Sequence, residues 1–279
     1  MNRALAIARE RNRDVTALLI ELGRGRFDLA DYPLAADLFT QAAATGSGND
    51  STDARIRLAR TWARAGDFAA AQSELVKAKA DIDRLGDTGF APLFLLASGE
   101  LAYESGRFAE AREQFERSSA LWTDAFPDEA SVEARVYLGL LDASRGARGA
   151  ARASLSAVLE QAHKMGRLAL EARARIDIAR LDVQRRAYQD ALAMLREVPE
   201  DGDQTLGPEL QGKSTHWRSQ ALGGAGDAGR ASAELATARK LLDGIRLRCR
   251  TVFVVDMPRG RISVFPTDSF PVRNPGRIR

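Results

Sequence analysis

The sequence predicts an all-α fold, a solenoid of about six antiparallel helical hairpins, because three columns of residues recur at a fixed spacing of 40. The first column consists of alanines, namely Ala71, Ala111, Ala151, Ala191 and Ala231. Large apolar residues follow each alanine by four positions: Leu75, Phe115, Leu155, Leu195 and Leu235. Small residues precede each alanine by twelve positions: Ala59, Gly99, Gly139, Ala179 and Ser219. Periods of this size are typical of repeat proteins, in which each unit buries its apolar face against its neighbours.

A further copy precedes these five at a spacing of 36, and it consists of Gly23, Ala35, Phe39 and Ala42. The chain is rich in alanine, so a single alanine column carries little weight. Three columns in the same register are much harder to obtain by chance. The repeats therefore predict one continuous domain over residues 15–245.

Each repeat unit reads as two helices joined by a tight turn. In the second copy Ala59 and Trp62 share one helical face, and Ala71 and Leu75 share another, at helical spacing. Gly66 interrupts the pattern between them, as a residue that ends one helix and allows the next to begin should do. Small residues at the facing positions indicate where two helices approach closely.

The hairpin pattern resembles the tetratricopeptide repeat. The resemblance rests on Gly106-Arg-Phe108-Ala-Glu-Ala111-Arg-Glu-Gln-Phe115 and on Ala30-Asp-Tyr32-Pro-Leu-Ala35-Ala-Asp-Leu-Phe39. It implies a right-handed superhelix with a concave groove that binds a peptide or protein segment. The long period also resembles that of kinesin-light-chain-like arrays and of arrays in bacterial serine/threonine kinases and multidomain regulators.

Several positions depart from the family pattern. The period exceeds the family's usual value of about 34, and the usual proline after the second helix is missing. Arg148 and Ala228 replace the aromatic residue at the turn in two copies, and Arg186 replaces the turn glycine in another.

The two ends of the chain differ from the repeats. Residues 1–14 read as a half-repeat or a capping helix. Residues 246–279 contain four prolines and form a basic tail, which we expect to be disordered or non-native in sequence. The alternative for the tail is a short β-hairpin, in which the β-type run Thr251–Val255 pairs with Ile262–Phe265.

The charge distribution argues against nucleic-acid binding. The net charge is +3, but residues 246–279 hold eight arginines and two aspartates. Residues 1–245 therefore hold 33 basic and 36 acidic residues, so the repeats lack the basic track that a nucleic-acid-binding helical repeat needs. The single cysteine, Cys249, and the lack of a long apolar stretch favour a cytoplasmic protein with no membrane partner.

No motif predicts catalysis, a cofactor or a metal ion. Gly224-Ala-Gly-Asp-Ala-Gly229 matches a phosphate-binding fingerprint, but the preceding residues read as a helix rather than the strand that this chemistry needs. The only histidines, His163 and His216, lack a recognisable nucleophile, and no zinc-ligand spacing is present. We therefore expect no catalytic residues, no cofactor and no metal site.

By resemblance to the family, the groove-facing positions lie on the first helix of each hairpin. The candidates for binding a partner are Arg57, Arg60, Arg64, Tyr103, Tyr137, Arg173, Arg180 and Trp217. Arginine binds carboxylates with two parallel hydrogen bonds, and tyrosine and tryptophan are effective anchors at interfaces. The alternative is that these arginines are solvated or pair with acidic residues one helical turn away.

The expected function is a non-catalytic protein-interaction scaffold, consistent with the C-terminal part of a bacterial signalling or regulatory protein. Two alternatives stay open: a nucleic-acid-binding helical repeat protein, and the sensor array of a serine/threonine kinase whose catalytic domain lies elsewhere. The partner's identity and the oligomeric state do not follow from the sequence.

Overall fold

A computed structural model describes residues 15–86, 88–121, 128–199, 206–249, 251–256 and 261–266, with side chains up to residue 245. The predicted half-repeat at residues 1–14 lies outside the described residues. The helices are α2 (Val15–Asp28), α3 (Tyr32–Thr45), α4 (Asn49–Ala65), α5 (Phe68–Leu85), α6 (Ala91–Glu104), α7 (Phe108–Ala120), α8 (Glu129–Ser144), α9 (Arg148–Lys164), α10 (Leu168–Gln184), α11 (Tyr188–Arg196), α12 (Pro208–Gly224) and α13 (Ala228–Cys249).

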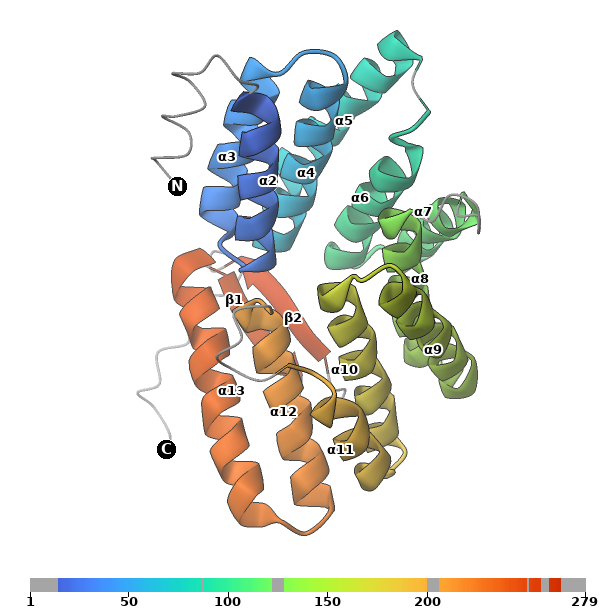
Figure 1. Cartoon of the computed structure of the whole chain (residues 1–279), viewed down its shortest axis with the longest axis vertical. Helices are drawn as coiled ribbons and strands as arrows, with labels where there is room; N and C mark the ends of the chain where they lie inside the picture. Colours follow the sequence, from blue (N-terminus) through green and yellow to red (C-terminus); the bar gives the residue numbers. More distant parts are fainter. Residues whose placement is uncertain are drawn as a thin grey trace, which may run out of the picture.

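Successive helices pair into six antiparallel hairpins, from hairpin 1 (α2 and α3) to hairpin 6 (α12 and α13). Each hairpin also contacts the next, so the array is continuous along the chain (Figure 1). The predicted all-α solenoid of about six hairpins, with a short non-helical tail, is confirmed. The last helix, α13, continues to Cys249, beyond the predicted end of the repeats at residue 245.

The columns of small and large residues meet inside each hairpin. A Cβ atom added at Gly99 would lie only 2.5 Å from the ring of Phe115 in the same hairpin. Gly23 approaches the ring of Phe39 in the same way, at 2.6 Å. The glycine therefore leaves the space that the large side chain of the second helix fills, sixteen residues along the chain.

The turns between the paired helices use the left-handed backbone conformation. Gly66, Gly106, Gly146 and Gly226 have φ values of 85°, 80°, 87° and 93°. Arg186 occupies the same place in hairpin 5 with φ 63°, a conformation that a residue with a Cβ adopts only at a cost. Gly226 lies in the sequence that matched the phosphate-binding fingerprint, and this sequence forms the turn between α12 and α13.

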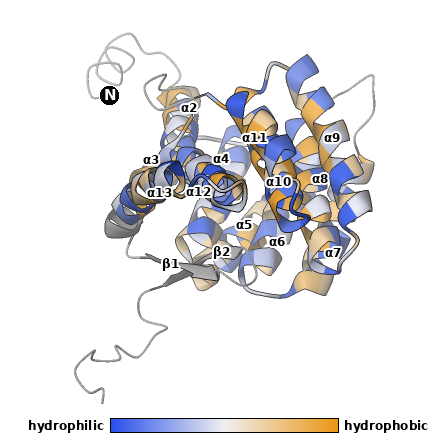
Figure 2. Ribbon diagram, turned by 90° about the horizontal axis from the view of Figure 1, so that it is seen from below, coloured by the Kyte–Doolittle hydropathy of each residue, from blue (hydrophilic) through white to orange (hydrophobic). Residues whose placement is uncertain are grey.

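Apolar side chains pack in a series of clusters along the array rather than in one central core. One cluster contains Val136, Leu155 and Ile178, which come from α8, α9 and α10. Hydrophilic and hydrophobic segments alternate along the same helices in Figure 2. In the part of the chain that the structure describes, no helix is long and apolar enough to cross a membrane.

The array curves until its last hairpin reaches its first (Figure 1). Ala30 and Tyr32 of hairpin 1 share an apolar cluster with Leu242 and Ile245 of α13. The start of α12 also fits against the end of α2, since a Cβ atom added at Gly207 would overlap the carbonyl oxygen of Asp28. The superhelix is therefore closed on itself.

Two strands follow α13. β1 (Thr251–Asp256) and β2 (Arg261–Pro266) form an antiparallel pair in which Val254 is opposite Ser263. β1 lies beside α13, and β2 lies beside α4. The expectation that the tail is disordered or non-native stays a prediction, and residues 267–279 lie outside the described part.

We expect Gly99→Ala to lower the free energy of unfolding by about 1–3 kcal/mol, because the added methyl group overpacks the contact with Phe115. Gly25→Ala is the control, because Gly25 is exposed on α2 and a Cβ atom added there would have no other atom within 4 Å. This change should stabilise the helix by up to about 1 kcal/mol. Urea denaturation of both variants measures the difference in unfolding free energy. Equal effects would show that the contact between the small-residue and large-residue columns does not determine the packing of the hairpin.

Arg186→Gly should stabilise the chain by about 1 kcal/mol, because glycine adopts a positive φ without the cost that arginine bears. Arg186 is exposed, so its side chain contributes little packing. The same denaturation experiment with Arg185→Gly provides a contrast, since Arg185 has φ −94° and bonds to Asp182. A loss of stability in Arg186→Gly would contradict the inference that the positive φ of Arg186 strains this turn.

Candidate functional site

The inner face of the closed superhelix surrounds a cavity of about 730 Å³. Its walls come from the first helix of every hairpin, α2, α4, α6, α8, α10 and α12, together with Tyr32 and Phe39 of α3 and the loop residues Asp128, Met165 and Arg167 just before α8 and α10. Charged and aromatic residues dominate this lining. The cavity is therefore lined by segments from all six hairpins.

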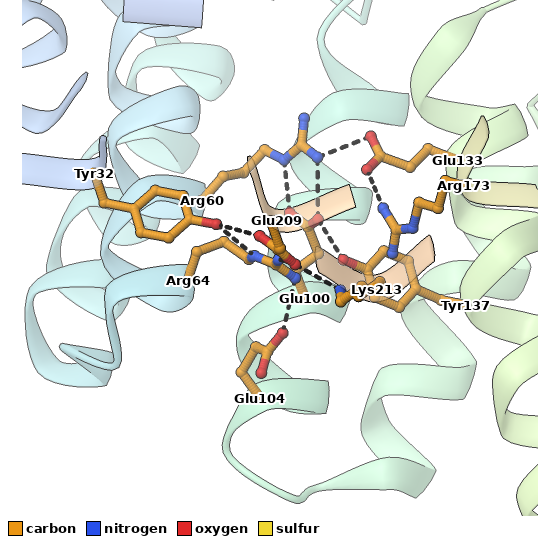
Figure 3. Close-up of polar contacts among 10 residues, drawn as sticks. All are labelled: Tyr32, Arg60, Arg64, Glu100, Glu104, Glu133, Tyr137, Arg173, Glu209 and Lys213. Atoms are coloured by element: carbon orange, nitrogen blue, oxygen red, sulfur yellow. Dashed lines mark hydrogen bonds and ion pairs between the residues drawn. The ribbon is translucent and has the colours of Figure 1, made fainter. Parts of the chain in front are cut away.

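Arg60 connects three hairpins across the cavity. It bonds both oxygens of Glu100 on α6, at 2.6 and 3.0 Å, and one oxygen of Glu133 on α8, at 2.8 Å. Arg173 on α10 donates to the other oxygen of Glu133 at 2.7 Å. The side chain of Glu100 is only 1% exposed. This arrangement, drawn in Figure 3, leaves each of the two carboxylates bound by at least one guanidinium group.

Arg64 makes the second connection, one helical turn further along α4. It donates to Glu104 of α6 at 3.2 Å and to Glu209 of α12. Glu209 also accepts hydrogen bonds from the Tyr32 hydroxyl at 2.8 Å and from the Lys213 ammonium group at 2.5 Å. Figure 3 shows these donors converging on Glu209. This carboxylate thus joins hairpin 6 to hairpins 1 and 2.

Tyr137 lies at the centre of the inner face and joins the charged groups to the apolar packing. Its ring stacks on Phe115, with centroids 4.6 Å apart, and its hydroxyl donates to Glu100 at 2.8 Å. The Arg173 guanidinium lies over the ring, 4.4 Å from its centroid, at the distance of a cation–π contact. Tyr103 packs edge-on against the same ring. Tyr137 is therefore fixed on every side.

Burial and ion pairing shift the pKa values of the acidic groups in opposite directions. Burial by itself would raise the pKa of Glu209, but the charges of Arg64 and Lys213 outweigh it and hold the pKa well below its usual value. Burial also raises the pKa of Glu104, and the attraction of Arg64 does not offset it. Burial raises the pKa of Asp28 on the cavity wall, with repulsion from Glu133 acting in the same direction. Glu209 therefore stays ionised, whereas Glu104 and Asp28 are protonated more readily.

The repeat period explains why these partners meet. Arg60 and Glu100, Arg64 and Glu104, and Glu133 and Arg173 are each 40 residues apart. Residues one period apart occupy the same position on adjacent inner helices, so opposite charges there face each other across the inter-repeat contact. Glu209 lies 145 residues from Arg64, and only the closure of the superhelix brings these two together.

The structure gathers five of the predicted groove residues around the cavity: Arg57, Arg60, Arg64, Tyr137 and Arg173. Arg57 pairs with Asp53 one helical turn away, as the alternative interpretation expected. Arg60, Arg64 and Arg173 pair instead across repeats. That the candidates bind a partner stays a prediction.

The three other candidates lie outside the described cavity wall. Trp217 is buried in an apolar cluster with Ala179 and Leu195. Tyr103 is an aromatic neighbour of Tyr137. Arg180 lies 3.9 Å from Asp177, and its Nε atom is buried without a hydrogen-bond partner among the described residues.

The acidic half of the site is absent from the candidates that the sequence indicated. The groove-facing positions of the repeats also include Glu100, Glu104 and Glu133. The predicted binding residues, however, are all arginines or aromatic residues. The spacing of 40 between Arg60 and Glu100 is a signal that could have found them. For Glu209 and Tyr32 the sequence offers no equivalent signal, because their contact depends on the curvature of the whole array.

Other candidate chemistry remains separate from the cavity. His163 is exposed and lies 3.3 Å from Glu171, and burial lowers the pKa of His216. Within the described residues, no group of three His, Cys, Asp or Glu side chains is placed to hold a metal ion.

Comparisons with known proteins identify the fold. No protein-family model matches the sequence, and no curated protein matches it significantly. Among solved structures, BtubC (BKLC) from P. vanneervenii is similar over 80% of this chain and 92% of its own, with 15% identity and a TM-score of 0.55. PilF from Pseudomonas aeruginosa is similar over 84% of this chain and 95% of its own, with 17% identity and a TM-score of 0.51.

A third similar structure comes from Pyrococcus horikoshii, a Signal Transduction ATPase with Numerous Domains (STAND) protein with a tetratricopeptide repeat sensor. It matches 84% of this chain at 13% identity with a TM-score of 0.57, but the match covers only 39% of that protein. At these identities the likeness defines the fold alone. The chain has a tetratricopeptide-repeat-like fold.

The two acidic partners of Arg64 should respond differently to neutralisation. Glu209→Gln should lower the free energy of unfolding by roughly 3 kcal/mol at pH 7, since it breaks a buried pair whose carboxylate is strongly stabilised. Glu104→Gln should cost only about 1 kcal/mol, because burial already disfavours that charge.

The pH dependence separates the two variants further. A lowered pKa means that the contribution of Glu209 is fully present above pH about 4.5 and is lost as the pH falls through the pKa in the folded state. The deficit of Glu209→Gln should therefore shrink below that pH, whereas the deficit of Glu104→Gln should not shrink. Urea denaturation between pH 7 and pH 3 measures both deficits. If the two deficits changed in parallel with pH, the opposite pKa shifts of Glu209 and Glu104 would be contradicted.

Proposed function

We propose that this chain is a non-catalytic scaffold that binds a short acidic segment of a partner protein at the concave face of its superhelix. The observation that supports this proposal is the cavity of about 730 Å³, which is lined from all six hairpins and has arginines at its edge. Cavities of about 300–1,000 Å³ are the size that ligands occupy in proteins. The cavity therefore has room for a few side chains of a bound segment.

The chemistry of the lining favours binding over catalysis. Among the described lining residues there is no serine, cysteine or histidine. The carboxylates Glu100, Glu133 and Glu209 are held by arginines and tyrosines. A carboxylate fixed in such pairs is poorly suited to accept a proton from a substrate.

The charge of the lining favours an acidic ligand. Seven basic and six acidic residues line the cavity, and protonation of Asp28, whose pKa is raised, would add to the positive excess. This local balance is the reverse of that over residues 1–245, where acidic residues outnumber basic ones. The lining therefore carries a small positive excess within a repeat domain that is slightly acidic overall.

Arg24 and Arg167 are the residues best placed to receive the first carboxylate. Both form ion pairs with the same oxygen of Glu129, at 3.8 and 3.3 Å, and Arg24 also pairs with Glu21 on its own helix. The side chains of Arg24, Arg167 and Glu129 are 34%, 47% and 40% exposed. Ion pairs exposed to this degree contribute little to stability, so these guanidinium groups exchange partners at little cost.

The similarity of fold to the sensor array of the Pyrococcus STAND protein supports a regulatory setting for such a scaffold. In that protein the array is described as a sensor, and it accounts for only part of the chain. We place the present array in the same class of role, as the interaction module of a bacterial signalling or regulatory protein.

Selection of peptides from a random dodecapeptide display library on the wild-type chain tests the proposal. The selected peptides should be enriched in Asp and Glu. For a selected peptide, Arg24→Ala with Arg167→Ala should weaken binding about tenfold and flatten its salt dependence, since charge-assisted contacts are removed. Fluorescence anisotropy at several salt concentrations measures both effects.

The matched control is Arg84→Ala with Arg107→Ala, which removes two exposed, ion-paired arginines outside the cavity lining. This variant should bind like the wild type. Peptides without acidic enrichment, or peptides that bind both double variants equally, would contradict the proposed function.

A further inference from the structure

The carboxylate of Glu209 lies in a cradle of three donors that come from different parts of the chain. The Tyr32 hydroxyl comes from α3, the Arg64 guanidinium from α4 and the Lys213 ammonium from α12. We call these three residues the carboxylate cradle. The side chain of Glu209 is 11% exposed and that of Arg64 is 13% exposed, so the carboxylate is largely withdrawn from water.

The cradle borders the cavity. All three of its residues, and Glu209 itself, belong to the cavity lining. Glu104, the other partner of Arg64, does not. A carboxylate that enters the cavity from solvent therefore meets the same donors that Glu209 now occupies.

The electrostatics of the cradle are those of an anion site. Despite its burial, Glu209 has a lowered pKa, because Arg64 and Lys213 favour its charged form. Arg64 also pairs with Glu104, but burial raises the pKa of that carboxyl group, so Glu209 is the counter-charge that the two cations favour in its ionised form. A site with these properties binds a carboxylate group whichever residue supplies it.

The position of Glu209 couples the cradle to the closure of the superhelix. Glu209 lies in the first turn of α12, two residues after Gly207, which contacts the end of α2. It holds α12 against hairpins 1 and 2 at the junction between the two ends of the array. Occupation of the cradle by Glu209 thus accompanies the closed form.

We propose that the carboxylate cradle is a binding position for an acidic side chain of the partner, and that Glu209 is an internal competitor for it. This inference rests on the proposed function, since the competing ligand is the same acidic segment. An acidic residue of the segment replaces Glu209 on Tyr32, Arg64 and Lys213. The chain thus binds its partner only when that partner outcompetes its own carboxylate.

The first experiment tests the cradle without any partner, with acetate as the probe. Glu209→Ala leaves the donors in place and removes the carboxylate. Sodium acetate should raise the melting temperature of this variant saturably, beyond the shift that sodium chloride gives at equal ionic strength. The wild type should respond equally to the two salts, because its cradle is filled.

The matched control is Glu74→Ala. Glu74 also pairs with one arginine and one lysine, Arg55 and Lys77, and its side chain is 13% exposed, but it lies outside the cavity lining. Acetate and chloride should act alike on this variant. If acetate and chloride also shift Glu209→Ala equally, the cradle is not a carboxylate site and the inference is overturned.

The second experiment measures competition, with acetylated hexaglutamate as the probe. Glu209→Gln keeps the shape of the side chain and removes its charge, and it should bind the peptide roughly fivefold more tightly than the wild type, because the competitor is weakened. Glu74→Gln should bind like the wild type. This isosteric variant also carries the test if Glu209→Ala does not fold.

The outcomes separate the inference from the proposed function. Equal or weaker binding of hexaglutamate to Glu209→Gln, with binding still weakened in the Arg24 and Arg167 double variant, would overturn the inference and leave the proposed function intact. If no chain binds hexaglutamate or a library peptide while acetate restores Glu209→Ala, the proposed function fails and the cradle is supported as a carboxylate site.

Discussion

Arg60 and Arg64 are largely buried on the inner face of the superhelix, and the ion pairs that join its hairpins depend on them most. A buried guanidinium group without a partner costs several kcal/mol, and these two arginines point from α4 toward the axis of the array. Each therefore binds two carboxylates, Arg60 on α6 and α8, and Arg64 on α6 and α12. The pairs that satisfy the arginines also fix the positions of the helices that supply the carboxylates.

Such pairs contribute more to geometry than to net stability. The cost of removing both charges from water offsets most of their attraction, and apolar residues of similar size often stabilise a fold as well. Their directional hydrogen bonds, however, favour the particular arrangement of the inner helices in which both oxygens of Glu100 and of Glu133 are bonded. Most apolar clusters hold neighbouring hairpins together, and one joins hairpin 1 to α13. The pairs of Arg60 and Arg64 also connect hairpins that are not adjacent in sequence. The inner ion pairs and this cluster therefore act together at the closure of the array.

The sequence predicts the hairpins because their information is local and repeated. The match between Gly99 and Phe115 recurs as Gly23 and Phe39 in another hairpin, so the pattern is visible without a structure. Part of the site is local in the same sense, since Arg60 and Glu100 are one period apart. The contact of Arg64 with Glu209 spans 145 residues. Its existence depends on small rotations between hairpins that add up along the chain, and no spacing in the sequence records them.

Trp217 shows the other limit of reading the groove from the sequence. Resemblance placed it on the inner face by position along the first helix, but α12 turns this residue into the contact with α10 and α11, where it packs with Ala179 and Leu195. A single-residue shift along a helix rotates a side chain by about a quarter turn, since a turn holds about 3.6 residues. Position in a repeat therefore predicts well the small and large residues that are buried in every copy, because packing constrains them in each repeat. It predicts groove residues less well, because no such constraint recurs at those positions.

A groove that is already filled by its own ion pairs imposes a chemical requirement on any partner. An uncharged segment that displaced Glu133 or Glu209 would remove one of the two carboxylates that pair with the buried Arg60 or Arg64, at a cost that its own apolar contacts would have to exceed. A segment with carboxylates at the right spacing restores each pair as it enters. Under the proposed function, the closed inner face discriminates by penalising the wrong ligand as much as by rewarding the right one. In an open groove lined by solvated arginines the same residues would attract acidic segments but would exclude little else.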